Sequence, residues 1–403
     1  MEEITMPKAA ILLCLCLNIS HFPTAESAQR PQRPNFLIIL ADDLGYETLG
    51  TYGGLDYETP RLDALAQQGL RLTRMYTSPV CTPSRMSFYT GRYTVNHGHD
   101  KVLPVHLGTR KTIKLAGYPN IAQTFRGAGY ATSVTGKWQL ATLEYHPNHI
   151  RESGFDSWCV WQIWRNGEKT GAPTVDIQAT RYWNPCFNHD GIIRRDIADK
   201  YGPDVLADYV IQKMTEATAS NEPFYIQHNM LLPHWPILET PGDKTTDNPP
   251  SLKAMIHYMD EVVGRLIDAV ETLGIQENTY IVFLGDNGTD LKTARRTKKG
   301  PVSGGKHHLG DGGMHVPAIL LGPGLPKDGA TLNDLVDMAD IFPTLCELAG
   351  IPLPAGPKLD GVSHAKRLRG ETDTPARAYI TAGIAGVNCV FDGQWRLHTD
   401  GKL

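Results

Sequence analysis

The fold class is decided by one stretch near the N-terminus, Phe36-Leu37-Ile38-Ile39-Leu40-Ala41-Asp42-Asp43. An unbroken apolar run that ends abruptly at two carboxylates indicates a strand buried on both faces, ending at the edge of a sheet. Strands of this kind belong to parallel sheets whose two faces are covered by helices.

Helical and strand-like patterns alternate along the following 300 or so residues, a spacing typical of this class of fold. The pattern predicts helices at 61–68, 120–127, 203–219 and 252–273, and strands at 130–134, 224–227, 280–284 and 316–321. We expect Thr59 and Pro60 to cap the first helix. Strands separated by helices predict an α/β fold with a mainly parallel sheet flanked by helices.

The texture changes after Gly350, where Pro352, Pro354 and Pro357 interrupt the alternation. Short strand-like pieces follow at 378–381 and 387–391, and the legible pattern ends at 395–398. They predict a small antiparallel C-terminal subdomain at 355–403, after a main α/β domain at 29–354 and a signal peptide at 1–28.

The composition excludes several classes of protein. Hydrophobic residues make up 41% of the 403 residues and charged residues 20%, which excludes a disordered, collagenous or coiled-coil chain. The net charge is −4, whereas a nucleic-acid-binding protein needs a strong basic excess or stripe. No internal stretch reaches the roughly 20 apolar residues of a membrane span, so we expect no stable membrane insertion.

The first 28 residues predict export. Lys8 precedes an apolar run at 9–17, and small residues follow at Ala25 and Ser27, as in a secretory signal peptide. A disordered tail or a short N-terminal anchor is the alternative. Export would remove two of the seven cysteines and leave an odd number, whose pairing the sequence leaves open.

Acidic pairs follow two of the predicted strands. Asp42-Asp43 ends the first strand, and Asp286-Asn287 follows the strand at 280–284. Open α/β sheets bind ligands at the carboxyl ends of their strands, and oxygen donors suit calcium or magnesium. Each pair could also be a simple turn. Their occurrence at equivalent strand ends favours a metal site.

The segment Cys81-Thr82-Pro83-Ser84-Arg85 carries a second chemical signal. Pro83 suits the first helical position, so we expect Cys81 to lie just before a helix N-terminus, where anions are stabilised and thiol pKa values fall. Arg85 adds a planar cation suited to an oxyanion. An inert buried cysteine is the alternative.

Together these segments resemble the formylglycine-dependent (type I) sulfatase family of the alkaline-phosphatase-like superfamily, over about residues 34–400. The matching pieces occur in the expected order: Pro34-Asn35-Phe36 leading to Asp42-Asp43-Leu44-Gly45, Cys81 to Arg85 with Thr90-Gly91-Arg92, Gly136-Lys137-Trp138, Pro233-His234-Trp235-Pro236, Gly285-Asp286-Asn287-Gly288, Lys306, Asp311-Gly312-Gly313 and Val316-Pro317. Many ordered pieces make a chance match very improbable.

The resemblance implies an exported, arylsulfatase-like hydrolase of sulfate esters, on carbohydrate or another alcohol. A formylglycine-generating enzyme would oxidise Cys81 to formylglycine, whose hydrate is the nucleophile. One Ca²⁺ would be held by Asp42, Asp43, Cys81, Asp286 and Asn287. The sulfate would be surrounded by the remaining catalytic residues Arg85, Lys137, His234 and Lys306.

Two departures from the family pattern stand out. Gln139 and Ala141 occupy positions where the family usually has His and Gly, and Gln cannot take the proton that the His accepts. The chain also stops at Leu403, so we expect an incomplete C-terminal subdomain. Two alternatives therefore remain: a phosphonate or phosphate ester hydrolase, and a sulfoglycan-binding protein with impaired turnover.

We expect two further clusters, one cationic and one aromatic, to have structural roles without contacting a ligand. We expect a solvated surface loop, in preference to a polyanion contact, for Lys292, Arg295, Arg296, Lys298 and Lys299. We expect packing, in preference to sugar binding, for Trp158, Trp161, Trp164, Tyr182 and Trp183.

Overall fold

The computed structural model describes Met1 and residues 33–401, except 106–108, 163, 166–167, 170–180, 195, 198, 244–248 and 291–293. Apart from Met1, the predicted signal peptide lies outside these residues. Arg33–Leu403 form one compact unit. None of the helices described is long and apolar enough to cross a membrane.

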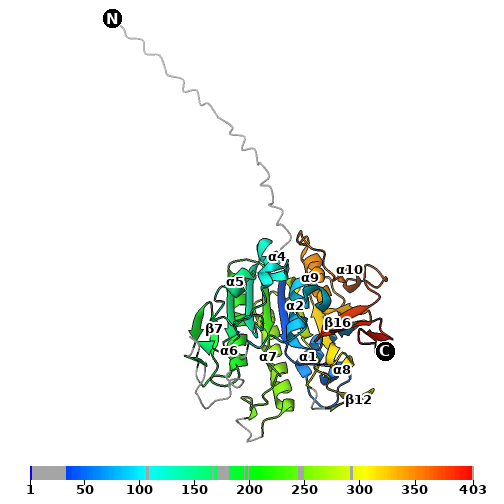
Figure 1. The fold of residues 1–403 in the computed structure, drawn as a ribbon. Helices are drawn as coiled ribbons and strands as arrows, with labels where there is room; N and C mark the ends of the chain where they lie inside the picture. The colour runs from blue at the N-terminus through cyan, green and yellow to red at the C-terminus, as the bar shows by residue number, and fades with distance from the viewer. Residues whose placement is uncertain are drawn as a thin grey trace. The chain divides into compact units, whose positions relative to one another are not determined.

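One large sheet forms the centre of this unit (Figure 1). Its strand order is β14-β2-β13-β10-β1-β9-β3-β4-β7-β8, and β15 pairs with β2. The five adjacent strands from β10 to β4 are parallel, whereas β13 and β7 run antiparallel to their neighbours. The predicted mainly parallel sheet is confirmed. The strands are β1 (Asn35–Ala41), β2 (Leu70–Tyr76), β3 (Ala131–Gly136), β4 (Ser157–Trp161), β7 (Phe187–His189), β8 (Ile192–Arg194), β9 (Phe224–Asn229), β10 (Thr279–Gly285), β13 (His315–Leu321), β14 (Ala330–Leu332) and β15 (Val336–Asp337).

Helices cover both faces of the sheet because the central strands are apolar on both sides. In β1, Phe36, Ile38 and Leu40 face one apolar cluster, and Leu37 and Ile39 face the other. Burying each such side chain contributes about 1.5–3 kcal/mol. The first cluster contains α2 (Cys81–Thr90), α4 (Ile121–Gly127) and α9 (Ile341–Ala349), and the second contains α1 (Pro60–Gln68), α6 (Gly202–Ala219) and α7 (Leu252–Thr272).

Shorter elements complete the unit. The short helices are α3 (Thr94–His97), α5 (His149–Glu152), α8 (Asp311–Met314) and α10 (Ala365–Leu368), and two small hairpins pair β5 (Trp164–Arg165) with β6 (Glu168–Lys169) and β11 (Ala294–Thr297) with β12 (Gly300–Ser303). β16 (Ile380–Ile384) and β17 (Val387–Phe391) confirm the two predicted C-terminal strands, and β18 (Arg396–His398) extends them to a three-stranded antiparallel sheet, red in Figure 1.

The expected cap of α1 is wrong in one respect. The Thr59 side chain does not cap the helix, because its hydroxyl instead accepts from Gly50 N at 3.3 Å. The cap comes from α7, where the Asp260 carboxylate accepts from Arg61 N and Leu62 N, both at 2.8 Å. A residue nearly 200 positions away performs this capping, so local sequence could not reveal it.

Candidate active site at the carboxyl edge of the sheet

Three parallel strands end level with one another and place site residues at the carboxyl edge of the sheet. Ala41 of β1 is in register with Gly285 of β10, so Asp42 and Asp286 emerge side by side. On the other flank, β3 ends level with β9, and Lys137 follows directly. The Lys137 Nζ atom donates to both carboxylate oxygens of Asp42, at 2.7 and 2.8 Å.

The turn before Lys137 requires glycine. Gly136 has φ +84°, and a Cβ there would lie 1.8 Å from the carbonyl oxygen of Asn229. Only glycine allows β3 to end this close to β9. The Gly-Lys pair in the sequence is therefore a geometric requirement for placing the cation.

Helix α2 presents Cys81 at its first position. The helix begins at Cys81, with Val80 as the N-cap, two residues earlier than Pro83 suggested. The corrected start places Cys81 in the first turn, whose backbone N–H groups lack helical partners. Cys81 is 3% exposed, and every residue of the helix is buried.

Arg85 lies one turn beyond Cys81 and therefore on the same face of α2. Its guanidinium donates to Asp286 Oδ2 through Nε and Nη2, at 3.0 and 2.8 Å, and to the carbonyl of Lys137 through Nη1 at 3.1 Å. This planar fork links the helix to two of the strand ends.

Asp43 gathers the remaining predicted residues. Its backbone adopts φ +64°, an uncommon conformation for a non-glycine residue, which is often found at functional sites. Lys306 Nζ donates to Asp43 Oδ2 at 2.6 Å, and His234 Nε2 lies 3.5 Å from the same oxygen. Asn287 Nδ2 donates to Asp43 Oδ1 at 2.8 Å. The structure thus brings the predicted site residues together.

The charges in the site act on one another. Burial alone would raise the pKa of Asp42, but the permanent cations Lys137 and Arg85 hold it well below its usual value. Burial raises the pKa of Asp286 to about 6, because it outweighs the attraction of Arg85. Burial also lowers the pKa of His234 to about 3, which leaves a neutral imidazole.

Cys81 lies within the electrostatic range of two of these cations. Burial tends to lower the pKa of the Arg85 guanidinium, but Asp286, Asp42 and Cys81 raise it above its usual value. The pKa of Lys306 is raised in the same way by Asp43 and Cys81, against burial. A nucleophile at residue 81 would therefore act beside positive charge.

The donor set fits a divalent cation. Asp42, Asp43 and His234 place possible ligand atoms within 4.8 Å of one another. The Asn287 Oδ1 atom is buried without a hydrogen-bond partner, which is uncommon for a buried polar atom. Carboxylate and amide oxygens are the ligands that calcium prefers.

A pocket of about 570 Å³ opens onto this cluster. Its wall combines polar groups with apolar side chains, and Trp235 is 53% exposed. The lining residues are Asp43, Pro233, His234, Trp235, Ile237, Leu252, Thr289, Asp290 and Lys306.

Gln139 lies close to the site, and burial and a backbone hydrogen bond fix its side chain. It is 5% exposed, has φ +60°, and its Nε2 donates to the carbonyl of Leu103 at 2.9 Å. A cavity of about 20 Å³, large enough for one water, lies between Gln139, Lys137 and Thr142.

Sequence reasoning missed Arg181 and assigned Tyr182 only to packing. Arg181 Nη1 lies 3.0 Å from His234 Nδ1, and the Tyr182 hydroxyl donates to the carbonyl of Leu231 at 2.7 Å. No spacing rule connects residue 181 with residue 234, so no sequence signal could have found this contact.

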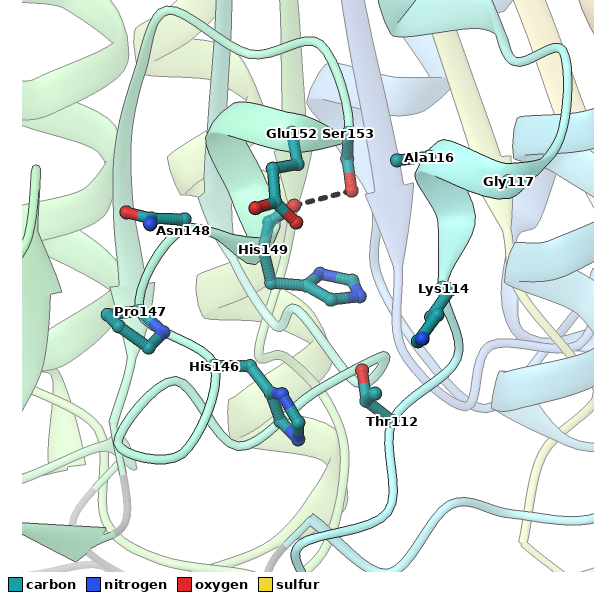
Figure 2. Close-up of a pocket in the computed structure, with 10 residues that line it drawn as sticks. All are labelled: Thr112, Lys114, Ala116, Gly117, His146, Pro147, Asn148, His149, Glu152 and Ser153. Atoms are coloured by element: carbon teal, nitrogen blue, oxygen red, sulfur yellow. Dashed lines mark hydrogen bonds between the residues drawn. The ribbon is translucent and has the colours of Figure 1, made fainter.

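A second cavity, of about 470 Å³, lies beside α5 (Figure 2). Figure 2 shows Lys114, His146 and Glu152 around it, with the His149 ring between them. His149 Nδ1 accepts from Trp138 Nε1 at 3.1 Å, and Nε2 lies 2.7 Å from the carbonyl of Ile113. Both nitrogens are thus engaged, which makes this cavity the weaker candidate.

The expected surface loop of cationic residues at 292–299 is confirmed in part and wrong at one residue. Lys298 and Lys299 are exposed and Arg296 pairs with Asp56, as expected of a surface loop, but Arg295 is 1% exposed above the Tyr57 ring. Lys292 and the Trp164 side chain lie outside the described residues. The described cysteines are all buried.

A parallel sheet with buried carboxylates and cations at its carboxyl edge defines the alkaline-phosphatase-like class of protein. Within that class, the sulfatase family matches residues 34–351, and the chain belongs to the sulfatase family.

Known relatives agree with this assignment. The chain is 29% identical over 350 residues to N-acetylgalactosamine-6-sulfatase of Sus scrofa, covering 82% of this chain and 65% of that protein. Among solved structures, the crystal structure of Ps i-CgsB superposes with a TM-score of 0.75 at 23% identity, covering 91% of this chain and 86% of the other. The phosphonate monoester hydrolase of Agrobacterium radiobacter gives 0.66 at 20%, covering 91% and 87%. These two structures support the fold alone.

Proposed function

We propose that this protein hydrolyses sulfate esters of carbohydrates, with Cys81 as the precursor of the nucleophile. The observation that carries the proposal is the position of Cys81 in the first turn of α2, one turn before Arg85, whose guanidinium bonds Asp286 at the strand ends. Positive charge fixed around the reacting group stabilises the charge that its oxygens carry in the transition state.

The metal in this proposal is one Ca²⁺, held by Asp42, Asp43, Asp286 and Asn287 together with residue 81. When bound, it would polarise a sulfate oxygen. Formylglycine at position 81 would supply the nucleophile as its hydrate. Because Cys81 is 3% exposed, a formylglycine-generating enzyme would have to act before α2 becomes buried.

The protein's own residues have separate tasks. Arg85 and Lys137, which pair with Asp286 and Asp42, would orient the sulfate from the side of the strand ends. His234 and Lys306 would contact it from the pocket side, where both approach Asp43.

The pocket supports a carbohydrate substrate. An exposed aromatic ring such as Trp235 can stack on a sugar, while the exposed Asp290 carboxylate can accept from hydroxyl groups. The name of the Sus scrofa relative also refers to a sulfated sugar.

Two alternatives have specific support. A phosphonate or phosphate ester hydrolase shares the fold, as the Agrobacterium structure shows for that protein. A sulfoglycan-binding protein with slow turnover is favoured by Gln139, because an amide cannot accept the proton whose removal releases sulfate.

Residue His307 can substitute for the base that is missing at position 139. Its backbone N–H donates to Pro79 O at 2.9 Å, beside the segment that leads into Cys81. Burial, followed by the charge of Lys306, lowers the pKa of His307, which favours the neutral ring that a base requires.

Two measurements test the proposal. Mass spectrometry of the peptide containing Cys81 should show formylglycine in protein made through a secretory pathway. A panel of matched sulfate, phosphate and phosphonate esters should then show release of sulfate in preference to phosphate. An unmodified cysteine, or faster phosphate or phosphonate release, would contradict it. Sulfated glycans that bind but release no sulfate would favour the binding protein.

A further inference from the structure

Two adjacent residues hold His234 from different sides. Arg181 is 2% exposed, and its guanidinium stacks on the Trp161 ring at 4.2 Å. Its Nη1 atom lies 3.0 Å from His234 Nδ1. The hydroxyl of Tyr182 contacts the backbone carbonyl of His234, so both the ring and the main chain are held.

The Nδ1 atom of His234 has two neighbours with opposite requirements. Arg181 can only donate a hydrogen bond, so it requires a lone pair on Nδ1. The carbonyl of Trp235, 2.6 Å from the same atom, can only accept and requires a proton there. The neutral imidazole can satisfy only one of them, and the choice fixes which nitrogen carries the proton.

Arg181 should prevail in this competition. Its guanidinium is permanently charged and buried, and a buried charged donor that faces another N–H group is more costly than a neutral carbonyl that loses its partner. With Nδ1 accepting from Arg181, the ring proton resides on Nε2. Asp43 Oδ2, an acceptor 3.5 Å from that atom, favours a proton there, whereas Lys306 Nζ, which lies 3.4 Å from it, donates to Asp43 Oδ2 at 2.6 Å.

We propose that Arg181 is a positioning residue that holds His234 with its proton on Nε2, so that a hydrogen-bond donor faces the substrate's anionic group. This inference rests on the proposed function, since it assumes an oxyanion in the pocket beside His234. Without Arg181, the ring would donate from Nδ1 to Trp235 and present a lone pair to the anion.

The tautomer can be measured without any turnover. In protein labelled with ¹⁵N-histidine, the His234 signals are assigned by their loss in His234→Gln. We expect wild-type His234 to be protonated on Nε2, and Arg181→Met to shift the proton to Nδ1. Arg181→Lys retains a charged donor and should keep the wild-type tautomer.

Kinetics provide the second readout. Removing one donor to an oxyanion typically costs about 10²–10³-fold in rate, and we expect Arg181→Met to lower kcat/KM by about that factor. Arg181→Lys should recover most of the loss. Arg194→Met is the matched control, because Arg194 makes a similar contact, at 3.3 Å, to His189 Nδ1 outside the pocket; its activity should be unchanged.

The outcomes separate this inference from the proposed function. A wild-type ring protonated on Nδ1, or an unchanged tautomer in Arg181→Met, overturns the role of Arg181 even if sulfate is released. Absence of sulfate release by wild-type protein overturns the proposed function, whatever the tautomer. If Arg181→Met does not fold, Arg181→Glu replaces it, because its carboxylate only accepts and should draw the ring proton to Nδ1; an unchanged tautomer there overturns the role of Arg181.

Discussion

Two buried clusters of charged residues in this protein differ in the groups that donate hydrogen bonds to their carboxylates. The strand-end cluster contains Asp42, Asp43, Asp286, Arg85, Lys137 and Lys306, and the C-terminal cluster contains Asp337, Asp340, His364 and Arg377. Both contain carboxylates that are almost fully buried. Their hydrogen bonds nevertheless come from different sources.

Backbone amides satisfy most of the C-terminal cluster. Asp340 accepts from Val362 N and Asp337 N, both at 2.8 Å, and from His364 Nε2 at 3.0 Å, besides its ion pair with Arg377. These amides are fixed parts of the fold. The cluster therefore ties the segment after α9 to the sheet and has no need of a ligand.

Side chains satisfy most of the strand-end cluster. Lys137, Lys306 and Arg85 reach the carboxylates from different segments, and the described contacts include one backbone donor, Asp43 N, at 3.1 Å from Asp286 Oδ1. Long cationic side chains can exchange a carboxylate for a metal-bound anion, whereas a backbone amide cannot leave. The comparison indicates that buried carboxylates paired with movable cationic side chains are typical of a reactive site, whereas carboxylates bound by backbone amides are structural.

The largest expected effect lies in the strand-end cluster. Cys81→Ala should leave the melting temperature nearly unchanged and lower turnover by about 10⁶-fold, a loss like that measured when a catalytic nucleophile is removed. Cys346→Ala is the control, since Cys346 is a buried core residue of α9. Activity of Cys81→Ala above that of a mock preparation would refute the assigned nucleophile.

Asp286→Asn should separate function from stability. We expect loss of bound calcium and a fall in turnover of about 10³-fold, measured by metal analysis and sulfate release. The free energy of unfolding should fall by less than in Asp340→Asn, because Arg85 keeps Asp42 at 3.8 Å and the neutral amide removes the burial cost that raises the pKa of Asp286 to about 6. Full activity, or full activity of chelator-treated protein, would contradict the metal assignment.

Asp340→Asn should show the opposite behaviour. Breaking a buried ion pair typically costs about 3–5 kcal/mol, and we expect the free energy of unfolding in urea to fall by that amount. The turnover of the folded molecules should remain that of the wild type. A variant of normal stability with impaired turnover would remove the distinction between the two clusters.

Gln139→His tests a residue near the site whose amide already donates a hydrogen bond to the carbonyl of Leu103. Wild-type protein should give a burst of about one alcohol per modified site and then a slow steady rate. The variant should raise the steady rate by about 10²-fold, the usual contribution of a general base, with an unchanged burst. Linear wild-type kinetics that Gln139→His does not improve would show that another base acts. A His307→Ala, His308→Ala double variant would then test whether these residues supply it.

The smallest effect concerns Asp260, a buried carboxylate outside both clusters, with backbone donors but no ion-pair partner among its described contacts. Burial raises its pKa in the folded protein to about 6, from about 3.8. The folded state then holds the proton more tightly, so this group's contribution to stability falls as the pH rises from 4 to 6. We expect the decline, about 2 kcal/mol, to disappear in Asp260→Asn, measured by urea unfolding at each pH. An unchanged slope would contradict the raised pKa.

Much of the fold followed from local patterns. The apolar run of β1 predicted a strand buried on both faces, because only such a strand can be apolar at every position. The helix at 252–273 was predicted within one residue of α7, since its apolar positions repeat with the helical period. The register of β1 with β10 then explains why two acidic pairs far apart in sequence meet.

The chain's own sequence determined the sheet, the order of its motifs and the set of oxygen and cationic groups at the strand ends. Strand ends and apolar periods are local, so they can be recognised without a structure. Only the tertiary structure decided that Asp260 caps α1, that Arg295 is buried, and that Arg181 contacts His234. Each of these contacts joins residues brought together by chain folding over dozens to hundreds of positions, and no period or spacing in the sequence encodes such a meeting.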